Sequence, residues 1–209
     1  GGGLSFSGSG AVTIDVSASE VAGAEGGSVS VATDQLTYDG SSVLCFLACA
    51  NHQIKANGSA AGTGNGGNIY VYSAHPAVID PNKVLAVFAD AAKDGSAIFA
   101  PVSGPNKKAI EFYPGGNVPF GTDPGQVSLS ARGGDTGGNG GTIVVSVNGA
   151  TLETKNAIDA SARSGDGNGG EVYFFNYITA VHAVEAVLAK GHGEGTGGKF
   201  TAFHNVNTF

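Results

Sequence analysis

Several features that mark common protein classes are missing from this sequence. None of its 209 residues is methionine, cysteine occurs twice, and charged residues make up 13% of the chain. The ten lysines and arginines form no cluster, and the formal net charge is −7. Nucleic acids and anionic membranes bind proteins through basic patches, so we predict neither as a partner. No apolar run approaches the roughly 20 residues that cross a bilayer, so we expect no membrane insertion.

The lack of methionine, together with the glycine triplet at residues 1–3, indicates a processed product or an excised segment. A targeting signal would then already have been removed, so localisation cannot be read directly from the chain. The two cysteines, Cys45 and Cys49, lie in an apolar stretch. In a strand they would be about 13 Å apart, too far for a disulfide, whereas one helical turn would bring them together. Their neighbours favour two buried thiols, and their redox state stays open.

Motifs of enzymes and metal sites are also absent. The sequence contains no Gly-x-Ser-x-Gly elbow, no Walker loop and no dinucleotide fingerprint after a predicted strand. The five histidines lack zinc-binding spacing, and we expect them on the surface. Residues 62–67 approach a calcium-binding nonapeptide repeat, but Gly66 stands where that repeat requires aspartate. We predict no cofactor and no metal, with structural Ca²⁺ as the remaining alternative.

Glycine, in contrast, is abundant, with 36 residues and no G-X-Y period, which excludes collagen. Five segments share one pattern: an alternating apolar stretch, a glycine-rich stretch ending in Gly-Gly, one polar residue and a second alternating stretch. A sixth copy is degenerate. Gaps of 40, 28, 46, 29 and 28 residues separate the last glycines of successive copies. These corner glycines are Gly27, Gly67, Gly95, Gly141, Gly170 and Gly198.

The repeat predicts an all-β parallel solenoid with loop insertions, in one domain of residues 1–209. A period of two after each Gly-Gly places alternate residues on the core face. We expect the corner glycines to supply positive φ and close backbone approach, with asparagine ladders beside them. The interior ladder should contain Val29, Ile69, Ile98, Ile143, Val172 and Phe200.

Two stretches also carry features of helices. Residues 80–88 begin with Asp-Pro, an N-cap followed by proline at the first helical position. Residues 178–189 are rich in alanine and valine at helical spacing. Both lead directly into a glycine corner, where a strand is expected. We favour a strand for the first stretch and leave helix and strand open for the second.

The segments at residues 82–99 and 129–146 resemble the filamentous haemagglutinin-type adhesins of two-partner secretion. An apolar strand there runs into an Ala-Asp-Gly corner, and the next copy reads Ser-Ala-Arg-Gly-Gly, a Gly/Asn corner, Gly-Gly and Thr-Ile-Val-Val-Ser. The resemblance covers residues 54–203. It implies a right-handed parallel β-helix exported to the cell surface. Two departures are the insertion of residues 91–93 before the corner and the absence of a secretion motif in residues 1–39.

Parallel β-helices also include polysaccharide lyases and hydrolases, which require convergent carboxylates. Asp159 and Glu171 flank one corner and could converge across a coil. Aspartate is also a common turn former, so we do not predict an enzyme and keep polysaccharide cleavage or carbohydrate binding as the alternative. The carboxylates considered are Asp90, Asp94, Asp159, Asp166 and Glu171.

Aromatic residues on the predicted outer face suit stacking against glycans or contact with another subunit, unless an insertion loop covers them. A single sequon at Asn57 is a candidate glycosylation site. The outward aromatic residues are Tyr70, Tyr72, Tyr173, Phe175 and Tyr177.

The two ends of a solenoid expose strand edges that must be capped or paired. Residues 1–17 and 199–209 are candidates for terminal capping or assembly strands. No charged capping helix is visible, so a second copy of the chain is the leading partner, ahead of surface glycans. We therefore predict a secreted, cell-surface structural or adhesive protein that self-associates into extracellular fibres or a surface layer.

Overall fold

The computed structural model describes residues 4–7, 11–19, 21–39, 51–59, 63–79, 81, 83–91, 95, 97–99, 118–135, 137–147, 150–152, 157–176 and 187–204. Every regular element among these residues is a β-strand, and every pair of neighbouring strands runs parallel. The all-β, parallel prediction is thereby confirmed. None of these ranges forms a helix that could span a membrane.

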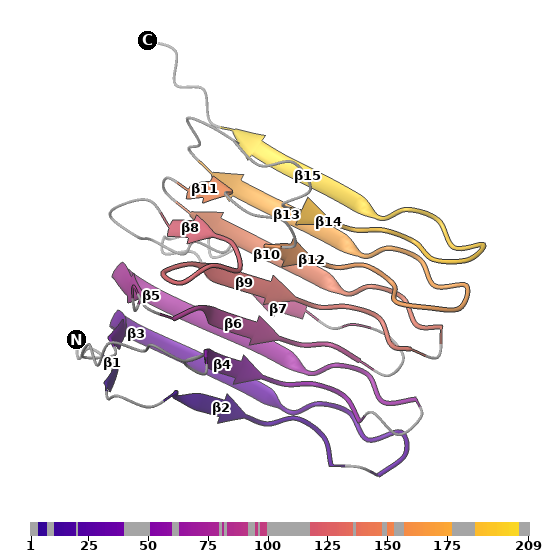
Figure 1. Ribbon diagram of the computed structural model, residues 1–209, viewed down its shortest axis with the longest axis horizontal. Coiled ribbons are helices and arrows are strands. Elements are labelled where there is room, and N and C mark those ends of the chain that lie inside the picture. Colours follow the sequence, from indigo (N-terminus) through magenta and orange to yellow (C-terminus); the bar gives the residue numbers. More distant parts are fainter. Residues whose placement is uncertain are drawn as a thin grey trace.

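The strands form two sheets, which we call sheet A and sheet B (Figure 1). Sheet A contains, in spatial order, β1 (Leu4–Ser7), β3 (Ser28–Asp39), β5 (Asn68–Ile79), β7 (Ala97–Phe99), β10 (Thr142–Val147), β13 (Glu171–Asn176) and β15 (Lys199–His204). Sheet B contains β2 (Thr13–Asp15), β4 (His52–Lys55), β6 (Leu85–Phe88), β8 (Val118–Phe120), β9 (Val127–Ser130), β11 (Ala150–Leu152), β12 (Ile158–Asp159) and β14 (Val187–Leu188).

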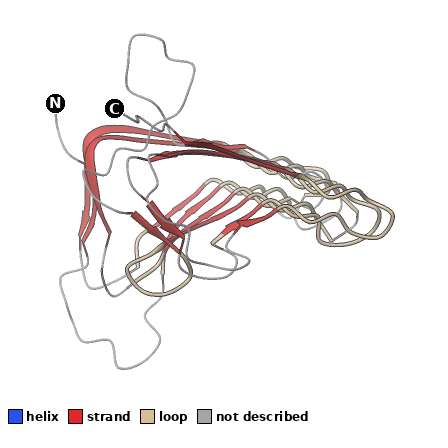
Figure 2. Cartoon of the chain, turned by 90° about the horizontal axis from the view of Figure 1, so that it is seen from above, coloured by secondary structure: helices blue, strands red, loops and turns tan. Residues whose placement is uncertain are grey.

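The chain alternates between the two sheets, and we call one sheet B strand, the glycine-rich segment after it and the following sheet A strand a rung. In the described part of the chain, rungs 1 to 6 are β2–β3, β4–β5, β6–β7, β9–β10, β12–β13 and β14–β15. Figure 2 shows that the two sheets approach each other toward the glycine-rich segments and separate on the opposite side. The predicted strand at residues 80–88 is confirmed by β6, and β14 is a strand within the second ambiguous stretch.

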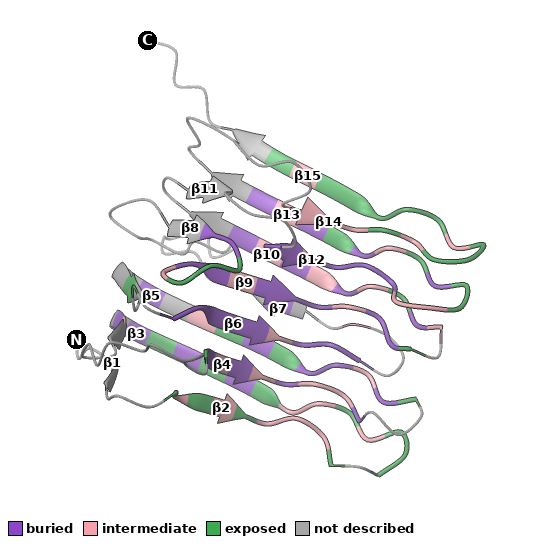
Figure 3. Ribbon diagram, viewed as in Figure 1, coloured by how far each residue is buried: buried purple, intermediate pink, exposed green. Residues whose placement is uncertain are grey.

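The predicted interior ladder is present residue for residue. Strand pairing joins Val29 to Ile69, Ile69 to Ile98, Ile98 to Ile143, Ile143 to Val172 and Val172 to Phe200. The first five are between 0% and 7% exposed, whereas Phe200 in rung 6 is 49% exposed. Figure 3 shows the same trend, with buried residues in the middle rungs and exposed residues in β2 and β15. Apolar side chains therefore pack from rung to rung, and the last rung leaves its ladder residue uncovered.

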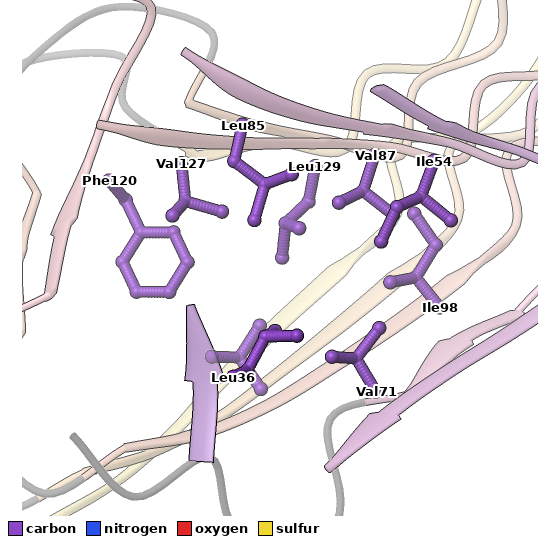
Figure 4. A pocket seen from close by; sticks show the side chains of 10 residues that line it. Leu36, Ile54, Val71, Leu85, Val87, Ile98, Phe120, Val127 and Leu129 are labelled. Carbon is purple, nitrogen blue, oxygen red and sulfur yellow. The ribbon is translucent and has the colours of Figure 1, made fainter. Parts of the chain in front are cut away.

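Where the sheets separate, aliphatic and aromatic side chains fill the interior. Phe120 and Phe174 pack edge to face with ring centroids 5.8 Å apart. A cavity of about 40 Å³ lies between the sheets and is lined by apolar residues, including Leu36, Ile54 and Leu129 (Figure 4). Because it offers almost no polar surface, we assign this cavity to the core.

The reason for glycine at the corners differs in part from the prediction. None of the six predicted corner glycines has positive φ; that conformation occurs at Gly23, Gly125, Gly137, Gly165 and Gly193. Close approach, the other predicted reason, does apply. The second glycine of each pair donates its N–H across the rung, as Gly141 does to the Ala131 carbonyl at 2.7 Å. The first glycine lies against a carbonyl of the next rung, where a Cβ would have no room.

The alignment of the third copy was wrong by one residue. Gly95 donates its N–H to the Asn139 carbonyl at 2.8 Å, just as Gly140 donates to the Asn168 carbonyl at 2.8 Å. Gly95 is therefore equivalent to the first glycine of a pair. The expected asparagine ladder is present: Asn139 Oδ1 accepts the Asn168 N–H at 2.8 Å, and Asn168 Oδ1 accepts the Thr196 N–H at 2.9 Å.

Candidate functional site

A column of side chains follows the ends of the sheet B strands. Because the strands are in register, the residues two positions beyond them are stacked neighbours. Most of these residues use their side chain to accept the N–H of the equivalent residue in the next rung, as Asn57 Oδ1 does from Asp90 at 2.9 Å. The column, from rung 1 to rung 6, is Ser17, Asn57, Asp90, Arg132, Ser161 and Lys190.

The densest polar contacts in this region surround Asp90, which is 8% exposed. Its Oδ1 accepts hydrogen bonds from Ser130 Oγ at 2.5 Å and the Arg132 N–H at 2.8 Å. Its Oδ2 accepts from Arg132 Nη2 at 2.9 Å and from Arg163 Nη2 at 2.8 Å. We call these four residues the Asp90 cluster. It joins rungs 3, 4 and 5, and it engages both oxygens of the carboxylate, so Asp90 has no free oxygen for proton transfer.

Two more carboxylates surround the cluster. Asp159 Oδ2 lies 4.0 Å from Arg132 Nε, and Asp135 Oδ1 lies 3.7 Å from Arg163 Nη1. The side chain of Asp135 is 80% exposed, whereas that of Asp159 is 15% exposed. Each arginine therefore has carboxylates close by, and the cationic charge of the region is largely neutralised.

A groove of about 320 Å³ lies on the outer face of sheet B beside this cluster. Outward residues of β6 and β9 form its floor, and Thr122 in the segment before β9 contributes to its wall. The groove combines the Phe88 ring with the hydroxyls of Ser128 and Ser130, and Arg132 and Asp159 also line it. An aromatic ring beside hydroxyl and planar charged groups is a surface on which a polyol can bind.

Asp159 and Glu171, the two carboxylates that could have converged in an enzyme, do not meet. Asp159 follows Ile158 in β12, and Glu171 precedes Val172 in β13; both apolar neighbours are fully buried. Side chains alternate across a strand, so Asp159 lies on the outer face of sheet B and Glu171 on the outer face of sheet A. Asp166 lies in a corner, where its Oδ1 accepts the Glu194 N–H at 2.9 Å, and Asp94 lies outside the described residues.

The predicted aromatic residues fall on sheet A. Tyr70 is 39% exposed. Strand register connects Tyr70 to Tyr173 through the backbone positions of Phe99 and Val144. Tyr72 and Phe175 follow two positions later in β5 and β13. Tyr177 lies outside the described residues, as do Cys45, Cys49 and His182.

Tyr173 has two charged neighbours on that face. Its hydroxyl donates a hydrogen bond to Glu171 Oε2 at 2.7 Å, and Lys199 Nζ lies 5.6 Å from its ring centroid. The hydrogen bond to Glu171 raises the pKa of Tyr173 above its usual value. At the N-terminal end of sheet B, hydrogen bonds from Ser17 lower the pKa of the Asp15 carboxyl, and Lys55 adds to this effect.

Two further predicted features have structural roles. The Asn57 side chain, which carries the candidate glycosylation site, is engaged in the column described above, and Ser59 of the same sequon is 1% exposed. The prediction of surface histidines was wrong for His52, which is 1% exposed and accepts the Val12 N–H on Nδ1 at 3.0 Å. His192 is exposed, as predicted. No group of three or more potential metal ligands occurs within the described ranges.

Sequence reasoning missed the Asp90 cluster as a unit. It considered Asp90 only as a candidate acid. Residues 130–132 and residues 161–163 both read Ser-Ala-Arg. In the structure Arg132 is in register with Ser161, not with Arg163, so the two segments are offset by two residues. The one signal in the sequence was that the chain has two arginines, each in a Ser-Ala-Arg run, and it does not identify Asp90 as their partner.

Comparison of the chain with protein-family models, with curated proteins and with solved structures finds no match. The functional conclusion therefore depends on the chain's own geometry: a stack of parallel rungs, an outer groove beside a neutralised charge cluster, and an apolar ladder that is uncovered at one end.

Proposed function

We propose that the protein is a secreted structural or adhesive protein of the cell surface, built as a right-handed parallel β-helix of the filamentous haemagglutinin type, that self-associates into fibres or a layer. The observation that carries this proposal is the uncovered ladder. Phe200 is 49% exposed, although its ladder neighbour Val172 is fully buried. An apolar residue in register with a core is covered when another rung follows, which favours association at this end.

The other contacts support a scaffold. The Asp90 cluster and the asparagine ladder connect one rung to the next through side chains, and the first glycines of the pairs do so through their backbone N–H groups. Parallel rungs with such nearest-neighbour contacts form an extended, stiff body. This organisation suits a protein whose function is to span distance or cover a surface.

The proposal predicts fibres of constant width when the protein is concentrated, visible by electron microscopy and as growing species in sedimentation. Phe200→Ser should reduce assembly, because it replaces the exposed apolar ladder residue with a polar one. Val78→Ser is the matched control, since Val78 is 41% exposed but lies in β5 of rung 2, away from both end rungs, and it should assemble normally. A monodisperse monomer at high concentration would refute self-association.

A second candidate function is carbohydrate binding, favoured by the groove on the outer face of sheet B. The neighbouring charges neutralise each other, so we expect neutral oligosaccharides to bind better than uronates. Ser128→Tyr, on the groove floor, should weaken binding at least about tenfold by filling the site. Ser30→Tyr, at an exposed outer position of sheet A, should leave it unchanged. Titration calorimetry with a panel of both sugar types tests this, and equal loss in both variants would contradict a groove site.

A further inference from the structure

Rung 6 contains a glycine at a position where no contact with the described residues requires the absence of a side chain. Gly26, Gly66, Gly140 and Gly169 are the first glycines of their pairs, and a Cβ on any of them would overlap a carbonyl oxygen of the following rung. Gly197 occupies the same position in rung 6, where a Cβ would meet nothing within 4 Å. Its small size becomes necessary only when a further rung stacks on this end.

Rung 1 has the backbone that such a glycine would meet. The carbonyls packed against the first glycines belong to Ala56, Ala89, Ala131, Ala160 and Ala189. In rung 1 the equivalent residue is Val16, whose carbonyl accepts the Gly27 N–H at 2.8 Å, as the Ala189 carbonyl accepts the Gly198 N–H at 2.6 Å. The exposed face of rung 1 and the exposed face of rung 6 are therefore built on the same backbone pattern.

The column beyond the sheet B strands indicates which kind of rung could stack in front of rung 1. In rungs 2, 3, 4 and 6 the column N–H donates to the side chain of the preceding rung. Rung 5 differs because its predecessor is Arg132, which has no acceptor. There the Ser161 N–H donates to Asp159 Oδ1 of its own rung at 2.9 Å, and Asp159 lies 4.0 Å from the Arg132 guanidinium.

Rung 1 repeats the arrangement of rung 5. The Ser17 N–H donates to Asp15 Oδ1 at 2.9 Å, so it requires no acceptor from a preceding rung. The exposed Asp15 carboxylate corresponds to Asp159. A rung of this kind follows a cationic column residue within the chain, and rung 6 carries Lys190 in that column position. Charge and hydrogen bonding thus match rung 1 to rung 6.

We propose that rung 6 of one copy stacks on rung 1 of a second copy in parallel register, with β14 beside β2 and β15 beside residues 28–33 of β3. β1 pairs with residues 36–39 of β3 and leaves that part of the strand edge open. This register specifies the partner and interface of the self-association proposed above, and it rests on that proposal. Phe200 then covers Val29 of the next copy, the Lys190 ammonium lies beside the Asp15 carboxylate, and Gly197 packs under the Val16 carbonyl. The head-to-tail contact does not close on itself, so it generates a filament.

Charge reversal tests this interface. Lys190→Glu should place two carboxylates together at the junction, and Asp15→Lys should place two ammonium groups there. Each variant alone should require at least about tenfold more protein to assemble, because like charges at an interface are repulsive. An equimolar mixture should assemble like the original protein, since the introduced glutamate of one variant meets the introduced lysine of the other, and the remaining junctions keep Lys190 beside Asp15. Asp123→Lys, an exposed change away from both end rungs, is the matched control.

The measurements distinguish the head-to-tail register proposed here from self-association in general. Light scattering and electron microscopy would follow assembly, with circular dichroism confirming that each variant folds. Fibres that form equally well from both single variants would overturn the head-to-tail register while leaving self-association standing. No fibres from the original protein would overturn both. Gly197→Val gives an independent check: it should leave the thermal melting of the isolated chain unchanged and abolish assembly.

Discussion

Gly140→Ala is expected to destabilise the folded chain by about 3 kcal/mol, the upper end of the usual cost of overpacking, because the obstacle is backbone and cannot rotate away. The new methyl group would overlap the Ala160 carbonyl oxygen and crowd the Gly170 N–H, both of which belong to backbone. That carbonyl already accepts the Gly170 N–H at 2.7 Å, so it cannot move without breaking the link across rung 5. Rungs 4 and 5 would have to separate.

Gly197→Ala is the matched control for this effect. It introduces the same methyl group at the equivalent position of rung 6, where nothing lies within 4 Å. Its free energy of unfolding should stay within about 0.5 kcal/mol of the original, as for surface substitutions generally. Urea denaturation followed by far-ultraviolet circular dichroism, at concentrations too low for assembly, measures both variants. Equal destabilisation would show that glycine is needed there for backbone flexibility and not for close packing.

Most of the fold could be predicted from the repeat, because the signals of the repeat are local in the sequence. Alternation after each Gly-Gly placed every residue of the interior ladder correctly, since a period of two fixes which side chains share a face. The degenerate third copy still supplied Ile98 to that ladder, although its corner glycine was aligned one residue out. Chain order of strands and corners was therefore readable from sequence.

The structural reason for glycine at each corner was harder to predict from the sequence. A glycine needed for positive φ and a glycine needed for close approach look identical in a sequence, and only the neighbouring rung distinguishes Gly137 from Gly140. The same limit explains Asp159 and Glu171, which are near in sequence but belong to outer faces of different sheets. Contacts between rungs depend on register, and insertions of unequal length conceal it until the strands are paired.

The Asp90 cluster illustrates how register determines the roles of charged residues. Its members come from three rungs, and the arginines are separated from Asp90 by 42 and 73 positions in the chain. Spacing along the sequence therefore carries no direct sign of the cluster. Charged residues are scarce in the chain, and several of them lie where adjacent rungs meet. This placement favours a structural function for the stack of rungs.

Asp90→Asn is expected to destabilise the chain by about 3 kcal/mol, because it leaves two guanidinium groups facing each other without their shared carboxylate. The side chains of Arg132 and Arg163 are 33% and 31% exposed, so solvent screens part of their repulsion and the effect falls at the low end for a buried ion pair. Asparagine also replaces one accepting oxygen with a donor that faces the two arginines.

Asp135→Asn is the matched control, since it makes the same change in a carboxylate 3.7 Å from Arg163 that is 80% exposed. Its effect should be below about 0.5 kcal/mol, as for surface ion pairs. Adding Arg163→Met to Asp90→Asn should recover part of the lost stability, because one of the two unpaired cations is then removed. Denaturation midpoints of the original protein, of Asp90→Asn and Arg163→Met as single variants, and of the double variant measure this coupling. A double variant whose losses simply add would mean that Asp90 stabilises the rungs through its bonds to Ser130 and the backbone, and not through the two arginines.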